Sequence, residues 1–408
     1  MFVISSPILP SFPMRVLQIV PSISLVYGGP SQMVMGFSAA LAAAGVDVTV
    51  LTTDSNGDTG QPPLDVPLNT PIPQDGYQIR YFRCSPFRRY KFSLDLLCWL
   101  NRHAQEFDLA HIHALFSPIS TAAATVARLR GLPYLLRPLG TLDPADLRKK
   151  KQLKQIYAAL FERSNLAGAA AIHFTSAQES KISERFGAMT RDLVIPLGVK
   201  PPAPTTTSSA EFRQKLGIPA DRAPLILFMS RLDPKKGLDL LLPALTQLIY
   251  EGSNFHWILA GSNPQDLAYE DKIRTEIRNS PLAAQTTLTG FVSGDLKAEL
   301  LTHADLFILP SYYENFGIAV AEAMAAGLPV VISDQVHIWQ EVQQAEAGWV
   351  VACNKDALTD LLRMVLQDAT ELKRRGKQGQ DYASSYYSWS AIAQTTVDAY
   401  SQILKLKS

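Results

Sequence analysis

The chain has 408 residues, which is too long for one ordinary α/β core and predicts two domains. Its hydrophobic fraction of 47% is that of a folded globular protein, and its formal net charge of +1 argues against a protein built around binding duplex nucleic acid. The three scattered cysteines form no CxxC pair, so they indicate neither a zinc ribbon nor a disulfide framework and favour a reducing, cytoplasmic compartment.

The first thirteen residues are apolar and contain proline, but they carry no basic n-region. We therefore interpret residues 1–13 as an N-terminal extension rather than a signal peptide, and we expect the first domain to begin at Met14. Whether the extension belongs to the folded protein stays open. No run of 18 or more apolar residues occurs, so no membrane-spanning segment is predicted.

Short runs rich in Val, Ile and Leu alternate with helical patterns along the whole chain, as is typical of parallel strands covered on both faces by helices. The strands predicted in the first half are Arg15–Val20, Val46–Thr52, Ile79–Arg83, Leu109–His113, Tyr134–Arg137, Ala170–Phe174 and Leu193–Pro196. Those predicted in the second half are Leu225–Met229, Trp257–Ala260, Thr286–Leu288, Leu306–Leu309, Pro329–Ile332 and Gly348–Val351. The helix predicted after the first strand is Ser31–Ala44.

A proline-rich polar stretch, KPPAPTTTSSA, separates the two series of strands. The predicted domains are therefore residues 14–199 and 223–388, with residues 200–222 as a linker and residues 389–408 as a closing helix. The predicted fold class is α/β, with two Rossmann-like, doubly wound domains facing each other across a cleft. In such sheets, ligands bind outside the carboxyl ends of the strands.

The first chemical motif is the segment LPSYYENFGIAVAEAMAAGLPVV from Leu309 to Val331. Gly317 stands at a helix entrance, where exposed backbone N–H groups and the helix dipole can hold a diphosphate. Glu314 in the loop and Glu322 in the helix can face one cleft and accept hydrogen bonds from sugar hydroxyls. Taken alone, each glutamate could equally be a surface or helix-start charge; the pair around Asn-Phe-Gly is much more specific.

The second motif is SRLDPKKG, residues 230–237, which follows a strand and opens a helix. Arg231 and Lys236 at the carboxyl end of that strand can stabilise a departing diphosphate. Segments of this kind are more commonly solvated charged turns with no ligand, and that alternative stays open.

Two weaker motifs lie in the first domain. Gly28 and Gly29 would allow a ligand close to the backbone, although they form no dinucleotide fingerprint and could be a plain turn. His111 and His113 share one face of a strand. We interpret His111 as a core residue and His113, nearer the carboxyl end, as the candidate for the site. No third ligand stands at metal-site spacing, so no metal is predicted.

A basic run, RKKKQLK, extends from Arg148 to Lys154 and continues into a helix. A solvated face is the usual role of such a run. The alternatives are contact with an anionic acceptor or with a membrane surface, which would make the cytoplasmic protein peripheral on the inner face of the plasma membrane.

Together these segments resemble family 4 (group 1) of the glycosyltransferases, the retaining enzymes of the GT-B fold, over nearly the whole chain. The segments that carry the resemblance are the Gly-Gly loop, the His-Ile-His strand, RPLGTL (137–142), SRLDPKKG (230–237), the two glutamates with seven residues between them, and the closing segment from Tyr387.

The resemblance implies an acceptor domain followed by a nucleotide-sugar donor domain, with the last helix crossing back onto the first. The catalytic residues that it implies are Arg231, Lys236, His113 and Glu314. The donor-binding residues that it implies are Gly28, Gly29, Gly261, Val292, Asn315, Phe316, Gly317, Ile318, Ala319 and Glu322. We place the acceptor side near Arg137, Gly140, Lys149 and Lys150.

The resemblance further implies transfer of a hexose, with retention and no enzyme nucleophile, from a nucleotide-diphosphate sugar, with UDP or GDP as the nucleotide, to a hydroxyl of a glycan or lipid-linked glycan in cell-surface polysaccharide synthesis. No cofactor is expected, and the absence of any Asp-x-Asp is consistent with a metal-independent enzyme. Three alternatives remain: an inactive nucleotide-sugar-binding subunit, an epimerase, and a phosphorylase of the same fold, for which we find no lysine to assign to a pyridoxal cofactor.

Overall fold

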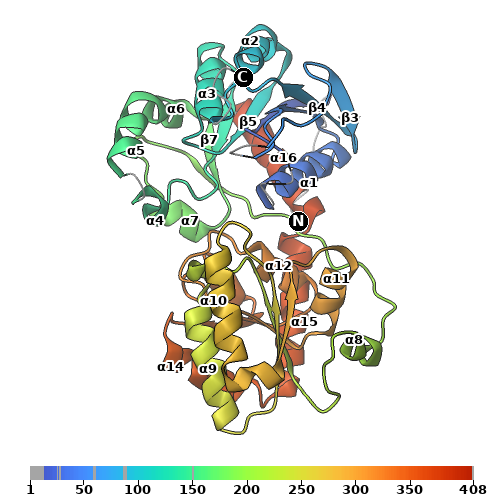
Figure 1. Ribbon diagram of the computed structural model, residues 1–408. Coiled ribbons are helices and arrows are strands. Elements are labelled where there is room, and N and C mark those ends of the chain that lie inside the picture. Colours follow the sequence, from blue (N-terminus) through green and yellow to red (C-terminus); the bar gives the residue numbers. More distant parts are fainter. Residues whose placement is uncertain are drawn as a thin grey trace, which may run out of the picture. The chain divides into compact units, whose positions relative to one another are not determined.

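The structure is a computed structural model that describes residues 13–24, 26, 29–57, 61–85, 90–148 and 151–406 (Figure 1). It divides into two compact units. Unit 1 comprises residues Met1–Gly198 and Trp389–Ser408, and unit 2 comprises Val199–Ser388. The chain thus passes from one unit to the other twice.

Unit 1 contains an eight-stranded sheet in the order β3-β4-β2-β1-β5-β6-β7-β8, parallel except for β3. Its strands are β1 (Arg15–Ile19), β2 (Asp47–Thr53), β3 (Pro71–Gln74), β4 (Tyr77–Phe82), β5 (Leu109–His113), β6 (Tyr134–Arg137), β7 (Ala171–Phe174) and β8 (Asp192–Val194). Its helices are α1 (Gly29–Ala43), α2 (Leu94–His103), α3 (Pro118–Leu129), α4 (Pro144–Leu147), α5 (Lys151–Tyr157), α6 (Arg163–Gly168), α7 (Ala177–Ile182) and α16 (Trp389–Lys405).

Strand β3 was not predicted. It holds two prolines, which restrict it to the edge of the sheet, where it pairs antiparallel with β4. Asp75 and Gly76 connect the two strands and both have positive φ angles, 36° and 82°. An Asp-Gly pair is the usual sequence of such a two-residue hairpin, so the signal was present in the sequence.

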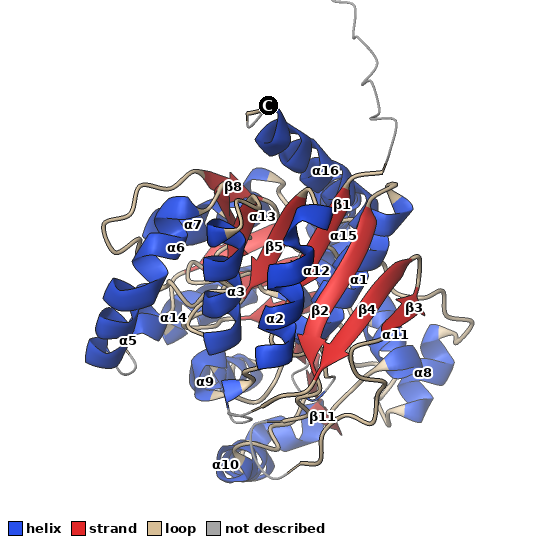
Figure 2. Ribbon diagram, turned by 90° about the horizontal axis from the view of Figure 1, so that it is seen from above, coloured by secondary structure: helices blue, strands red, loops and turns tan. Residues whose placement is uncertain are grey.

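The two faces of the unit 1 sheet have different chemistry. Leu17 of β1 and Ile112 of β5 face the apolar core that α2 and α3 cover, and these two helices lie side by side in Figure 2. The alternate positions carry Gln18 and His111, which point toward α1 and α16. The period of two along each strand thus separates a hydrocarbon face from a polar one.

Helix α16 belongs to unit 1 because its first residue packs on glycines of that unit. A Cβ at Gly36 of α1 or at Gly198 would overlap the Trp389 ring. Tyr400, one of the largest fully buried side chains, lies further along the same helix.

Unit 2 contains a six-stranded parallel sheet in the order β11-β10-β9-β12-β13-β14. Its strands are β9 (Leu225–Met229), β10 (His256–Ala260), β11 (Thr286–Gly290), β12 (Leu306–Leu309), β13 (Val330–Ser333) and β14 (Gly348–Val351). Its helices are α8 (Ser209–Lys215), α9 (Leu238–Tyr250), α10 (Leu267–Arg278), α11 (Gly294–His303), α12 (Ile318–Ala325), α13 (Trp339–Gln344), α14 (Lys355–Val365) and α15 (Ala369–Tyr386).

Unit 2 follows the strand order of a Rossmann sheet, and the predicted α/β class with two doubly wound domains is confirmed. Helix α8 lies within residues 200–222, which we predicted as a linker. A capping box between Ser208 and Glu211 starts this helix. Among the described residues, no helix is both long enough and apolar enough to span a membrane.

Candidate active site

Two loops meet in unit 2 where the strand order reverses, at the carboxyl ends of β9 and β12. Gly237, in the loop after β9, has a φ of 72°, and a Cβ there would overlap the carbonyl oxygen of Pro310 after β12. The backbone N–H of Tyr312 donates to the carbonyl of Lys235 at 2.8 Å. Two sequence motifs that are far apart in the chain are therefore in direct backbone contact, at the position where open α/β sheets bind ligands.

Lys236 and Glu314 form an ion pair across these two loops. The Lys236 ammonium donates to the Glu314 carboxylate and is largely buried, with 9% of its side chain exposed. The backbone of Glu314 is fixed from the other side: its N–H donates to the Gln335 carbonyl at 3.2 Å, and its carbonyl accepts from the His337 N–H at 3.0 Å. The structure thus brings together two of the predicted catalytic residues.

Arg231 lies in the same loop but remains exposed, with its guanidinium 3.4 Å from the Asp233 carboxylate. Burial and the neighbouring charge of Lys236 lower the pKa of Lys235. Three cations are therefore concentrated in one turn, with Asp233 and Glu314 as the carboxylates that offset them. Such a turn can accept an anion if a carboxylate moves aside.

Helix α12 supplies backbone donors beside this pair. Its N-cap, Gly317, has a φ of 78° and no capping side chain. The Val320 and Ala321 N–H groups bond to the Gly317 carbonyl, whereas those of Ile318 and Ala319 belong to the first turn, which lacks intrahelical acceptors. The helix start therefore offers N–H groups and a positive dipole end.

Two further predicted residues flank the helix start. Phe316 is buried, and its ring meets that of Tyr387 edge to face at 5.4 Å, so its side chain is part of the core. Asn315 is half-buried in the same loop. On α12 itself, Glu322 accepts from the Lys297 ammonium at 2.6 Å.

The predicted residues of β10 and β11 also lie together. The Gly261 N–H donates to the Gly290 carbonyl at 2.7 Å, and Val292 follows two residues later. Gly261 has a φ of 147°, and a Cβ there would overlap the Ser230 carbonyl oxygen next to Arg231. The loops that follow β9, β10, β11 and β12 therefore all lie at the carboxyl ends of neighbouring strands.

In unit 1, two histidines and a tyrosine form a fully buried chain of hydrogen bonds. His173 donates from Nε2 to the Ile195 carbonyl at 2.8 Å, so its Nδ1 must accept from Nε2 of His111 at 3.1 Å. Nδ1 of His111 then accepts from the Tyr400 hydroxyl at 2.7 Å. These contacts assign neutral rings, and burial holds the pKa values of both histidines well below 6.5.

His113 lies beside this chain at the carboxyl end of β5, with its ring stacked 4.8 Å from that of His111. Its Nε2 donates to Gln18 Oε1 at 2.7 Å, which leaves Nδ1 as an acceptor with no partner among the described residues. Burial, and then the nearby charge of Arg137, lowers its pKa well below 6.5. A neutral ring with a free acceptor nitrogen can bind a hydroxyl group.

Arg137 pairs with His113 in the strand register and is itself buried. Its guanidinium donates to Met33 Sδ at 2.8 Å, its Nε has no acceptor among the residues that the structure describes, and burial lowers its pKa to about 10. Gly140, with a φ of 79°, donates its N–H to the buried Glu179 carboxylate at 3.0 Å. Gly29 is exposed at the start of α1, and the predicted site residues Gly28, Lys149 and Lys150 lie outside the described residues.

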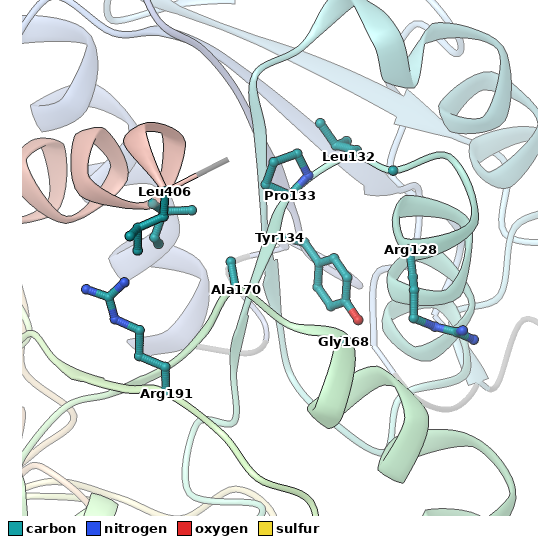
Figure 3. A pocket seen from close by; sticks show the side chains of 10 residues that line it. Arg128, Leu132, Pro133, Tyr134, Gly168, Ala170, Arg191 and Leu406 are labelled. Carbon is teal, nitrogen blue, oxygen red and sulfur yellow. The ribbon is translucent and has the colours of Figure 1, made fainter. Parts of the chain in front are cut away.

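Two pockets can be compared with these predictions. In unit 2, a pocket of about 440 Å³ next to the cation-rich turn is lined by Lys235, Asp239, Tyr312 and three others. In unit 1, a pocket of about 370 Å³ lies where strands begin: Arg191 and Leu406 stand on one side and Arg128 on the other (Figure 3). That edge is opposite to the carboxyl ends, so the second pocket contains none of the predicted residues.

Several partners of the predicted residues were missed. Lys297 lies in no recognisable motif, and only the folded chain brings it to Glu322. Gln18, His173 and Tyr400 contact the histidines from three separate segments; of these, only the alternation of the β7 strand could have indicated His173. Within the described part of the chain, no group of three or more His, Cys, Asp or Glu side chains could hold a metal ion.

Two family descriptions match the chain, one in each unit. Residues 28–198 match the glycosyl transferase 4-like domain, and residues 208–382 match glycosyl transferases group 1. The chain therefore belongs to group 1 of the glycosyltransferases, family 4, as the sequence motifs predicted.

The individual proteins that the chain resembles share about a third or less of their aligned residues with it. An uncharacterized glycosyltransferase of Methanocaldococcus jannaschii is 32% identical over 195 residues, or 46% of this chain; the match spans only about half (47%) of that relative's length. The D-inositol 3-phosphate glycosyltransferase of Kineococcus radiotolerans is 26% identical over 91% of this chain and 90% of its own. Among solved structures, HepE of Anabaena in complex with UDP and glucose has a TM-score of 0.72 at 19% identity, over 95% of this chain and 100% of that one, which confirms the fold.

Proposed function

We propose that the protein is a retaining glycosyltransferase that moves a hexose from a nucleotide-diphosphate sugar to a hydroxyl of a glycan or lipid-linked glycan. The observation that carries this proposal is the arrangement in unit 2, where Arg231 and the Lys236–Glu314 pair lie at the reversal of the strand order. Membership of the family and the UDP complex of HepE support it.

In this proposal, the charge that develops on the leaving diphosphate is stabilised by Arg231 and Lys236, together with the N–H groups at the start of α12. Positioning and electrostatics then replace a covalent intermediate, and cations of the protein replace a metal ion. The loops that hold Gly261 and Val292 are assigned to the nucleotide.

The carboxylates of unit 2 are assigned to hydroxyl groups. Glu314 would accept from the transferred hexose and Glu322 from the ribose, each exchanging part of its contact with a lysine for a contact with the ligand. In unit 1, the free Nδ1 of His113 would accept from a sugar hydroxyl, and Arg137 and Gly140 with the segment around Lys149 and Lys150 would serve the acceptor. We place the enzyme in the cytoplasm, in cell-surface polysaccharide synthesis.

A thermal-shift panel with UDP, GDP, ADP and dTDP, followed by the matching nucleotide sugars, tests the proposal. A ligand at about a hundred times its Kd should stabilise the native state by about 2.7 kcal/mol, a shift of several degrees. With the donor found, NMR of the product in the presence of EDTA should show the donor's anomeric configuration. An inverted product would contradict retention, loss of transfer with EDTA would contradict metal independence, and no response to any nucleotide would count against a transferase that acts on its own.

A further inference from the structure

A single helical segment projects at the edge of unit 1. It consists of α5, a π-helical turn at Ala158–Glu162, and α6, which can be followed away from the sheet in Figure 1. We call residues 148–168 the basic helix segment, because it begins with the basic run of the sequence. The proposed function gives the stretch around Lys149 and Lys150 to the acceptor, and it assigns no task to the side chains from Leu153 onward.

The inner side of the segment is firmly anchored in unit 1. The buried Glu162 carboxylate accepts from the Phe116 N–H at 2.9 Å and from the Thr121 hydroxyl at 2.7 Å. Asn165 donates to the Thr121 carbonyl, and its own carbonyl accepts from Tyr134. These contacts fix the orientation of the segment, so its outer side faces away from the unit 1 core.

The outer side is apolar. Leu153, Ile156 and Leu160 follow each other at intervals of three and four residues, which places them on one side of the helix, and they are 63%, 60% and 66% exposed. Phe161, 51% exposed, adds an aromatic ring next to Leu160. Single exposed apolar residues are ordinary, but four within nine residues form a patch of the kind that marks an interaction surface.

The charge around this patch has one sign. The segment contains six basic residues and one acidic residue, the buried Glu162, although the whole chain has a net charge of only +1. Arg148, Lys151 and Arg163 are exposed and form no ion pair with any described residue. An apolar stripe bordered by unpaired cations is the composition of a helix that lies in the interface of an anionic membrane.

We propose that the basic helix segment docks unit 1 onto the surface of a bilayer that contains anionic lipids. Leu153, Ile156, Leu160 and Phe161 enter the acyl boundary, and the unpaired cations bind the headgroups. A second copy of the chain fits less well, because a two-fold interface would bring this basic segment against itself with no exposed carboxylate of the segment to offset the charge.

Vesicle sedimentation tests the proposal with the full chain and no nucleotide sugar. The protein should bind phosphatidylcholine vesicles containing about 30% phosphatidylglycerol, and bind pure phosphatidylcholine much more weakly. Changing Arg148, Lys151 and Arg163 together to Gln should weaken binding to the anionic vesicles about 100-fold. Changing Leu153, Ile156 and Leu160 together to Gln should weaken it by at least about 100-fold.

The matched control replaces three exposed apolar residues elsewhere: Leu129→Gln, Tyr250→Gln and Met364→Gln. This control should bind vesicles like the wild-type protein, and circular dichroism should show all variants folded. Equal binding by the segment variants and the control, no binding by the wild-type protein, or a dimer in solution that only the Leu153, Ile156 and Leu160 substitutions dissociate would overturn the proposal. A protein that binds vesicles but transfers no sugar would contradict the proposed function and leave this inference standing.

Discussion

The two units hold their candidate site residues by different means. In unit 1, His111, His113 and His173 are buried, neutral and fixed by hydrogen bonds, none of which involves a carboxylate of the described residues. In unit 2, Lys236 and Glu322 each form an ion pair, with Glu314 and Lys297, whose side chains are partly exposed. Buried neutral groups can position a ligand but cannot offset its charge, whereas an ion pair with a partly exposed member can exchange partners with the ligand.

The largest consequence of this difference is an acid-sensitive unit 1. The pKa values of its three buried histidines lie well below 6.5 in the folded protein. The unfolded chain therefore binds more protons once the pH falls below about 6.5, and the free energy of unfolding decreases as the pH falls further. Between pH 7 and pH 5.5 we expect a loss of about 3 kcal/mol, measured by urea unfolding.

Hydrogen exchange shows where this loss occurs. Peptides from β5 and β7 should lose protection at pH 5.5 before those of the unit 2 sheet, whose strands contain a single histidine, His256, with a pKa that burial lowers to about 4. Equal loss of protection in both units, or stability that is unchanged down to pH 5.5, would mean that the histidines of unit 1 accept protons in the folded state.

The second prediction concerns the charge of unit 2. Lys236→Met should lower kcat/KM about 100-fold, because it removes a largely buried cation that the leaving diphosphate needs. Lys235→Met is the matched control: Lys235 is next in sequence, and its side chain lies at the pocket with Asp239 and Tyr312. We expect less than a threefold change from it, measured by transfer to the acceptor. Equal effects of the two substitutions would mean that the turn contributes only general positive charge.

The third prediction concerns the close backbone contact that keeps the loop of Lys236 in position in unit 2. Gly237→Ala should lower the free energy of unfolding by about 3 kcal/mol, since the residue combines a left-handed φ with overlap of the Pro310 carbonyl. Gly252→Ala has a similar φ, 80°, but open space around the new methyl group, and should cost about 1 kcal/mol. Denaturant titration of both variants gives the difference. Equal costs would show that the two loops can separate easily.

The sequence predicted the interior of both units better than their edges. Buried parallel strands such as β9 and β12 are continuous apolar runs, because helices cover both faces, and these runs were found. The edge strand β3 contains Pro71 and Pro73, which are atypical of strands, and was not. Residues that act within one loop, such as those of SRLDPKKG, can be found from spacing alone.

Partners brought together by the fold could not be found in this way. Tyr400 reaches His111 across 289 positions of sequence, and Lys297 reaches Glu322 from a separate helix. No local sequence pattern predicts either contact, because each depends on how helices that are distant in sequence pack in the folded unit. The roles of the predicted site residues therefore remain predictions, although several of them are brought together.

The smallest predicted effect separates the two residues of the Glu322–Lys297 pair. Glu322→Gln should weaken binding of the nucleotide about tenfold in calorimetry, because a charged acceptor for the ribose hydroxyls becomes neutral. Lys297→Met leaves the carboxylate in place and removes only its present partner, so its affinity should change less than threefold. The opposite result, with a large effect of Lys297→Met and none of Glu322→Gln, would mean that the cation binds the nucleotide and that the carboxylate only holds it in position. Unit 2 would then recognise its ligand through positive charge alone, and the exchange of partners inferred for its carboxylates would not occur.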